Sequence, residues 1–166
     1  MKILFVLDKP NLYGSEQHVL SLMEAAKKDD EVYLLVFSDG PLLKKLTSKN
    51  ISFSIISMRW YTIFTLINIF SFLKKGNFDI IHAHQPKAIF WMSIVAKIAS
   101  IPCVITIHSL PSSNIQSHSG LVKRWVVGIF HHFVKLTAEI MAAHVIYLSQ
   151  FSFSQAFFKY KSQVIP

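Results

Sequence analysis

The chain has 166 residues, of which 52% are hydrophobic and 16% charged, with a formal net charge of +8 and one cysteine. This composition supplies apolar side chains for one buried core and excludes an intrinsically disordered chain, and a single cysteine excludes an intramolecular disulfide. Because the longest apolar segment, residues 60–73, is shorter than the roughly 20 residues that span a bilayer, the sequence predicts one cytoplasmic domain without a transmembrane helix.

Predicted strands and helices alternate along the whole chain. In chain order they are strand 2–7, helix 15–28, strand 31–37, helix 41–49, strand 51–56, helix 61–75, strand 79–83, helix 87–99, strand 103–108, helix 120–142, strand 144–148, helix 151–159 and a strand beginning at residue 163. Continuous apolar strands are typical of a parallel sheet covered on both faces. The expected fold is therefore a doubly wound, Rossmann-like α/β domain with right-handed crossovers.

Individual residues make this prediction more specific. Ser15 is expected to cap the first helix, and Pro86 is expected to begin the fourth. The helix 87–99 is apolar on nearly all sides, which predicts that it is largely buried. Cys103 lies within an apolar strand, so we expect a buried, unreactive thiol.

A glycine loop follows the first predicted strand, at the edge where doubly wound folds bind ligands. Gly14 and Ser15 open the next helix, where backbone N–H groups can approach an anion. The loop has neither the second glycine of a dinucleotide fingerprint nor the Gly-Lys-Ser/Thr of a P-loop. A tight turn with a capping residue is the alternative interpretation.

Histidines accompany the fourth and fifth predicted strands. His82 and His84 alternate along one strand and share a face, Lys87 follows them, and His108 ends the next strand. Since these strands are expected to be neighbours, His84 and His108 are predicted to face one cleft as an acid, base or phosphate donor. The alternatives are structural histidines and a zinc site. No carboxylate or cysteine supports zinc, so neither a metal nor another cofactor is expected.

Positive charge is concentrated in the second half of the chain. No acidic residue occurs in residues 80–138, whereas five lysines and arginines do. Such an imbalance suggests an anionic partner: a phosphate-bearing ligand, a nucleic acid or an anionic membrane. A nucleic acid is not expected, because the basic residues are not interleaved with aromatic residues on strands.

The predicted helix 120–142 has two contrasting stripes. Arg124, His131 and Lys135 form a basic stripe, which makes them candidates for contact with a membrane surface. The opposite stripe is apolar and consists of Val122, Val126, Ile129, Phe133 and Ile140. The alternative is an ordinary amphipathic helix packed on the sheet.

Together, these segments resemble the N-terminal domain of retaining glycosyltransferases of family 4, which have the GT-B architecture. Gly14–Leu20 is similar to the family's Gly-Gly-x-Glu-x-His-Val loop, and Asp79–His84 to its Asp-hydrophobic-hydrophobic-His-x-His strand. Thr106–His108 is similar to its Thr-x-His strand end, and Val164–Pro166 to the segment that leads into the C-terminal domain. Tyr13 stands where the family usually has its first glycine, which is expected to restrict the loop or narrow the cleft.

The resemblance implies a role for each site residue. Gly14 and Ser15 would approach the donor diphosphate, and His108 would act at the reaction centre. His84 and Lys87 would line the acceptor side.

The resemblance also implies a function for the whole chain. Residues 1–166 would form one acceptor-binding domain, and the domain that binds the nucleotide-sugar would be absent. The complete two-domain enzyme would transfer a hexose to a cell-envelope glycan or lipid-linked acceptor at the inner face of the membrane, whereas this chain alone would be inactive. A non-catalytic binding module and half of a sugar-nucleotide epimerase are the alternatives.

Overall fold

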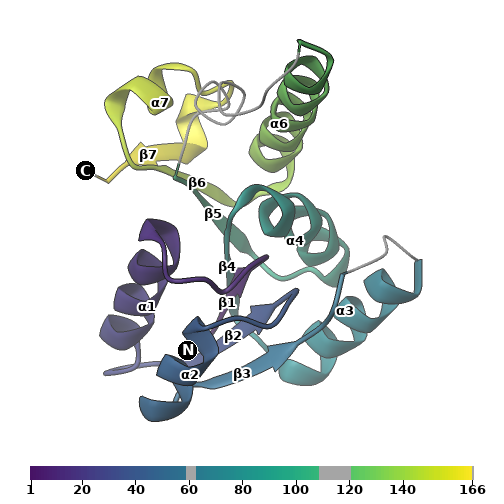
Figure 1. Ribbon diagram of the computed structural model, residues 1–166. Helices are drawn as coiled ribbons and strands as arrows, with labels where there is room; N and C mark the ends of the chain where they lie inside the picture. The colour runs from purple at the N-terminus through teal and green to yellow at the C-terminus, as the bar shows by residue number, and fades with distance from the viewer. Residues whose placement is uncertain (59–62, 109–120, 166) are drawn as a thin grey trace.

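The computed structural model describes residues 1–58, 63–108 and 121–165 and has the predicted α/β alternation (Figure 1). The strands are β1 (Lys2–Leu7), β2 (Glu31–Val36), β3 (Ser52–Ile55), β4 (Ile80–His84), β5 (Cys103–Ile107), β6 (His144–Tyr147) and β7 (Ser162–Val164). The helices are α1 (Gly14–Ala26), α2 (Leu42–Ser48), α3 (Ile63–Gly76), α4 (Pro86–Ala99), α6 (Leu121–Met141), α7 (Gln150–Ser154) and a 3₁₀ helix (Lys159–Lys161).

All seven strands are parallel and lie in one sheet in the order β3-β2-β1-β4-β5-β6-β7. From β1 the chain builds outward through β2 to β3, then crosses back to β4 and continues in the other direction. The reversal occurs between β1 and β4, and doubly wound folds bind ligands outside the carboxyl ends of the strands at such a point. The predicted fold class is confirmed, and so is the prediction that β4 and β5 are neighbours.

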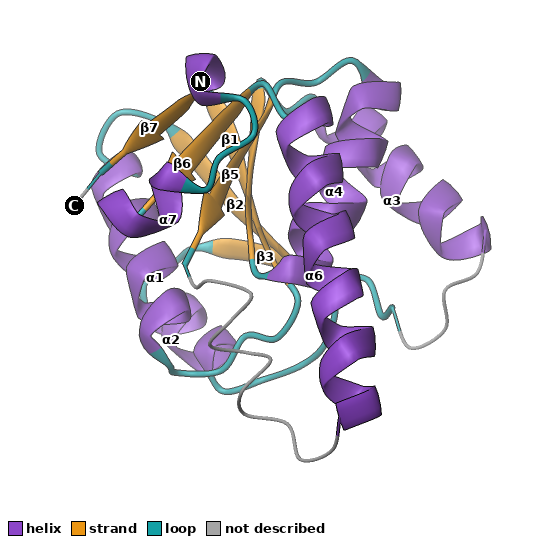
Figure 2. Ribbon diagram, turned by 90° about the horizontal axis from the view of Figure 1, so that it is seen from above, coloured by secondary structure: helices purple, strands orange, loops and turns teal. Residues whose placement is uncertain are grey.

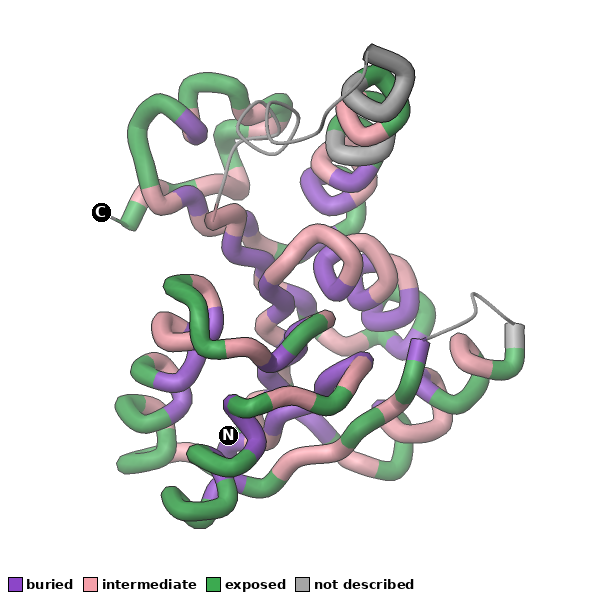
Figure 3. Tube along the Cα trace, in the orientation of Figure 1, coloured by how far each residue is buried: buried purple, intermediate pink, exposed green. Residues whose placement is uncertain are grey.

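Helices cover both faces of the sheet, with α1 and α2 on one side and α3, α4 and α6 on the other (Figure 2). Strand β1 is apolar at successive positions because it is covered on both faces of the sheet. Leu4 and Val6 enter the core under α3, α4 and α6, whereas Phe5 and Leu7 enter the core under α1 and α2. Figure 3 shows the same pattern, with buried strands inside and the exposed sides of α1 and α2 outside.

Two predicted details in the core are confirmed. Helix α4 begins at Pro86, packs between α3 and α6, and buries most of its apolar residues. The thiol of Cys103 is buried, and burial raises its pKa to about 12, so it is unreactive at neutral pH.

Ser15 does not cap α1, so that prediction is wrong. Tyr13 occupies the N-cap position without a side-chain capping bond, and the Ser15 hydroxyl lies within the first turn, where it donates to the carboxylate of Glu16 at 2.9 Å. The N–H groups of the first turn of α1 therefore have no side-chain cap.

Helix α7 is shorter than the predicted helix 151–159 because a buried carboxylate binds the backbone that follows it. Glu139 of α6 accepts the N–H groups of Phe157 at 2.6 Å and Phe158 at 2.8 Å. These N–H groups are thereby removed from helical pairing, and the chain turns toward β7. The predicted strand at residue 163 is confirmed as β7.

Helix α6 does not pack on the core through its predicted apolar stripe, as an ordinary amphipathic helix would. Val134, Ala138 and Ala142 at its end face the core. Of the predicted apolar stripe, the four residues whose side chains are described are all exposed: Val126, Ile129, Phe133 and Ile140. The predicted start of this helix at Gly120, the preceding loop 109–119 and residues 61–62 lie outside the described residues.

Candidate functional site

Four histidines meet at the carboxyl ends of β4 and β5, beside α1. His84 Nδ1 lies 3.0 Å from His108 Nε2, and His82 Nε2 lies 2.8 Å from the hydroxyl oxygen of Thr106. The ring of His18 lies edge-on to both rings of the pair, with centroids 5.3 Å from His108 and 6.2 Å from His84. We call His18, His82, His84 and His108 the histidine cluster. The structure thus brings His84 and His108 together at one edge, as predicted.

Burial keeps three of these imidazoles neutral. Burial is the main cause that lowers the pKa of His82 and of His108 to about 4, and neighbouring histidines contribute to the same shift. Burial also holds the pKa of His84 well below its ordinary value. At neutral pH the three rings therefore act as hydrogen-bond donors and acceptors rather than as cations.

The two paired histidines differ in accessibility. His84 is fully buried, and within the described residues its other ring nitrogen, Nε2, has no hydrogen-bond partner. His108 is half-buried and lies at the end of β5. Within the described residues, His108 is therefore the more accessible ring of the pair.

The glycine loop opens toward solvent beside this cluster. Gly14 is exposed, and a Cβ added there would meet no atom within 4 Å. Tyr13, at 73% exposure, points away from the protein and does not fill the loop. The uncapped first turn of α1 can therefore receive an anionic group.

Gln85 ties the loops of this edge together, and sequence reasoning missed it. Its backbone has a φ of 69°, and its Oε1 accepts the N–H groups of Asp8 and Lys9, both at 2.9 Å. Its Nε2 donates to the carbonyl of Lys9 at 3.2 Å and to the buried carboxylate of Glu16 at 2.8 Å. The only signal in the sequence was a polar residue between a strand end and Pro86.

Lys87 lies at the same edge but outside the histidine cluster. Its Nζ is 3.3 Å from the carboxylate of Asp8 and donates to the carbonyl of Met58 at 3.3 Å. The ammonium group is therefore held beside the end of β1, at the reversal point of the sheet. Within the described residues, no group of three histidine, cysteine or acidic side chains is arranged to hold a metal ion.

Residues 13–153 match Glycosyltransferase Family 4. The chain belongs to this family. The match includes the glycine loop and all four members of the histidine cluster.

The relatives of this family 4 domain are longer proteins. An Escherichia coli UDP-Gal:alpha-D-GlcNAc-diphosphoundecaprenol alpha-1,3-galactosyltransferase is 28% identical over 152 residues, which cover 87% of this chain and 38% of that protein. The structure of Anabaena Alr3699/HepE in complex with UDP-glucose has a TM-score of 0.79 at 20% identity, covering 99% of this chain and 43% of that one. The family 4 domain thus has the fold of one half of a GT-B protein.

The fold alone does not distinguish a transferase from an epimerase. A putative UDP-N-acetylglucosamine 2-epimerase from Listeria monocytogenes has a TM-score of 0.63 at 11% identity, covering 97% of this chain and 44% of that one. The family match, and not the fold, assigns the chain to the glycosyltransferases.

Of the basic stripe predicted on α6 of the family 4 domain, the structure describes one side chain, that of Lys135. Lys135 is only 11% exposed, lies 3.6 Å from the carboxylate of Glu139 and donates to the carbonyl of Gln155. It is therefore turned toward the C-terminal segment. The side chains of Arg124 and His131 fall outside the part of the chain that the structure describes. None of the described helices is long and apolar enough to cross a membrane.

Proposed function

We propose that this family 4 domain is the acceptor-binding half of an enzyme that moves a hexose from a nucleotide-sugar to a lipid-linked acceptor of the cell envelope. The observation that carries the proposal is the histidine pair beside the open glycine loop, at the reversal point of a family 4 sheet. The acceptor named for the Escherichia coli relative, a sugar on diphosphoundecaprenol, and the UDP-glucose of the Anabaena structure support these substrate classes.

Each group at this edge has a proposed task. The N–H groups at Gly14 and Ser15 receive the diphosphate of the donor. As the acceptor hydroxyl oxygen bonds to the anomeric carbon, the bond from that carbon to phosphate oxygen breaks, and the diphosphate leaves with the proton of the hydroxyl. His108, a neutral imidazole, hydrogen-bonds a hydroxyl of the reacting sugar, and His84 fixes its ring. Lys87, fixed by Asp8, faces the acceptor side.

The proposal also assigns donor binding to a separate domain. In a two-domain cleft, binding and transfer need groups from both halves, so residues 1–166 bind acceptor and contribute only part of the donor site. We propose that the complete enzyme works peripherally at the cytoplasmic face of the membrane, since a polyprenyl acceptor is confined to the bilayer.

A chimera tests this function. The chain is joined to the C-terminal half of the Escherichia coli galactosyltransferase and assayed with labelled UDP-galactose and GlcNAc-diphosphoundecaprenol. Transfer to the lipid-linked sugar is expected, while the chain alone transfers nothing. Acceptor binding without any transfer in a folded chimera would favour a non-catalytic binding module instead.

A further inference from the structure

Helix α6 presents an apolar surface to solvent. We call Trp125, Val126, Ile129, Phe133 and Ile140 the α6 stripe; they lie on one side of the helix and are each at least 55% exposed. Phe133 is continuous with α4, since its ring lies 5.7 Å from that of Phe90. Contiguous exposed apolar side chains of this size mark a surface that contacts a partner or a membrane.

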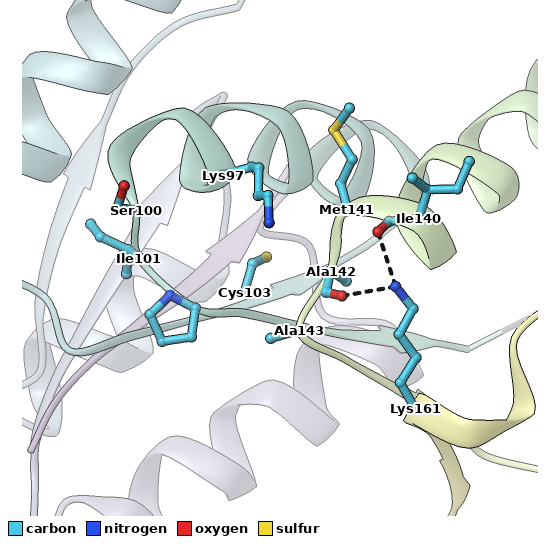
Figure 4. A pocket seen from close by; sticks show the side chains of 10 residues that line it. Lys97, Ser100, Ile101, Cys103, Ile140, Met141, Ala142, Ala143 and Lys161 are labelled. Carbon is cyan, nitrogen blue, oxygen red and sulfur yellow. Dashed lines mark hydrogen bonds between the residues drawn. The ribbon is translucent and has the colours of Figure 1, made fainter.

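A cavity of about 480 Å³ lies where the α6 stripe ends. It is formed by the C-terminal ends of α4 and α6 and the start of β5, at the edge of the sheet opposite the histidine cluster (Figure 4). Ile140 belongs both to the α6 stripe and to the cavity wall, and Met141 follows it. The cavity and the stripe therefore form one continuous surface.

Two lysines reach into this cavity from different elements. Lys97 comes from the last turn of α4, and within the described residues it makes no hydrogen bond or ion pair. Lys161 comes from the 3₁₀ helix and donates to the carbonyls of Ile140 at 3.0 Å and Ala142 at 3.2 Å. We call this space the lysine cavity.

The two ammonium groups repel each other. Burial lowers the pKa of Lys161, and the charge of Lys97 lowers it further, while the charge of Glu139 opposes the shift. Glu139 offsets part of this positive charge, but its carboxylate also lies 3.6 Å from Lys135, so the three lysines around it leave a net positive charge. An anion between Lys97 and Lys161 would remove the repulsion.

We propose that the lysine cavity binds the phosphate of an anionic phospholipid while the α6 stripe enters the apolar boundary of the same leaflet. The inference rests on the proposed membrane location of the enzyme and adds a lipid site distant from the reaction edge. Charge complementarity selects this occupant: the apolar residues and the two cations share one surface, as an amphiphile with an anionic head requires. A protein partner could occupy this surface only if it presented an anionic group next to an apolar face, whereas every anionic phospholipid carries both.

Vesicle binding by the chain tests the proposal. Affinity is measured by co-sedimentation with vesicles of phosphatidylcholine alone and of phosphatidylcholine with phosphatidylglycerol. We expect tighter binding to the anionic vesicles, and Lys97→Ala should lower that affinity about fivefold without changing binding to neutral vesicles. Lys28→Ala, which removes the same charge from an exposed position in the turn after α1, across the sheet, should have no such effect.

Trp125→Ser and Ile129→Ser separate the cavity from the stripe. Both side chains are exposed, so these variants should fold normally and lose binding to both kinds of vesicle. Equal effects of Lys97→Ala and Lys28→Ala would overturn the lysine cavity and leave membrane binding intact. No binding of the unchanged chain to either vesicle would overturn both the cavity and the membrane location. Binding of free glycerol 3-phosphate as tight as that of anionic vesicles would also overturn the assignment to a membrane lipid.

Discussion

At the residue scale, His108 combines a fixed backbone with an accessible ring. It directly follows β5, whose buried residues hold the main chain, and His84 at 3.0 Å orients the imidazole from behind. Such a residue can hold a polar contact to a reacting sugar without moving during the reaction. These contacts distinguish it from His84, which the protein encloses completely.

His108→Ala in the active chimera should lower turnover about a hundredfold per folded molecule, the usual effect of removing one preorganised polar contact in a closed cleft. The fold should remain intact. Melting temperature and turnover are measured on the same preparation, with His108→Asn as the variant that keeps a hydrogen-bonding group. A large fall in melting temperature with unchanged turnover per folded molecule would show that His108 is a structural residue.

The histidine cluster should make the domain sensitive to acid. In the folded state the pKa values of His82 and His108 are about 4, below the ordinary value of 6.5, so the unfolded chain binds more protons between these values. The free energy of unfolding therefore carries no penalty from these histidines above about pH 6.5, and it falls progressively as the pH is lowered toward 4. Melting curves recorded across this range check the prediction.

Two substitutions, one inside the histidine cluster and one outside it, test whether the cluster causes this acid sensitivity. His84→Leu removes a buried ring whose charged form is strongly disfavoured, so its melting temperature should fall less between pH 6.5 and pH 4 than that of the parent. His144→Gln, at the start of β6 and outside the cluster, should retain the parent's acid sensitivity. Equal acid sensitivity of the parent and His84→Leu would contradict an origin in this cluster.

At the element scale, Glu139 connects α6 to the C-terminal segment. Its fully buried carboxylate accepts the Tyr147 hydroxyl at 2.7 Å as well as the N–H groups of Phe157 and Phe158, and Lys135 lies 3.6 Å away. A buried carboxylate with this many donors is stable only as a complete set. The path of the chain before β7 therefore depends on one side chain of α6, in addition to the pairing of β7 with β6.

Glu139→Ala should release this segment. The variant leaves three donors without their acceptor, and we expect a loss of about 3 kcal/mol or more in the free energy of unfolding. Hydrogen exchange at Phe157 and Phe158 should accelerate more than exchange in β1. Glu24→Ala, at an exposed site on α1, is the matched control and should change neither quantity. Unchanged exchange at Phe157 and Phe158 would contradict the anchoring role.

The sequence predicted the presence and order of helices and strands better than it predicted which face of a helix is buried or where a helix ends. Periodicity placed helix α6 correctly but could not show which stripe meets the core. Lys135 is turned inward by Glu139 in the next turn of the same helix and by Gln155, which lies 20 residues away in sequence and comes near only in the fold. The end of α7 depends on the same carboxylate. Gln85 escaped detection for a related reason: its hydrogen bonds join loops that are adjacent only after β1 and β4 pair.

At the scale of the whole molecule, the order of strands in the sheet determines where the candidate site lies. The alternation of strands and helices was sufficient to predict a doubly wound fold, and the fold brings His84 and His108 to one edge. Long-range side-chain contacts decide which histidine is accessible. The sequence motifs could not decide that, since His84 and His108 follow similar strands.

The isolated chain should bind nucleotide-sugars weakly. If the donor is held mainly by a second domain, calorimetry with UDP-glucose, UDP-galactose and GDP-mannose should show little heat, because the glycine loop supplies only part of the contacts. The chimera with its second domain serves as the positive control. Micromolar binding to residues 1–166 alone would show that the proposed division of donor and acceptor roles is wrong.

The central place of β1 also governs how the chain folds during synthesis. Residues 2–7 are made first, yet one of their two partner strands, residues 80–84, is made almost eighty residues later. At a synthesis rate of 5–20 residues per second, one edge of this strand, which is apolar from residue 3 to residue 7, stays unpaired for roughly 4 to 15 seconds. Unpaired apolar strands of this kind associate with other chains. The nascent protein should therefore depend on chaperones that hold its first half until β4 emerges from the ribosome.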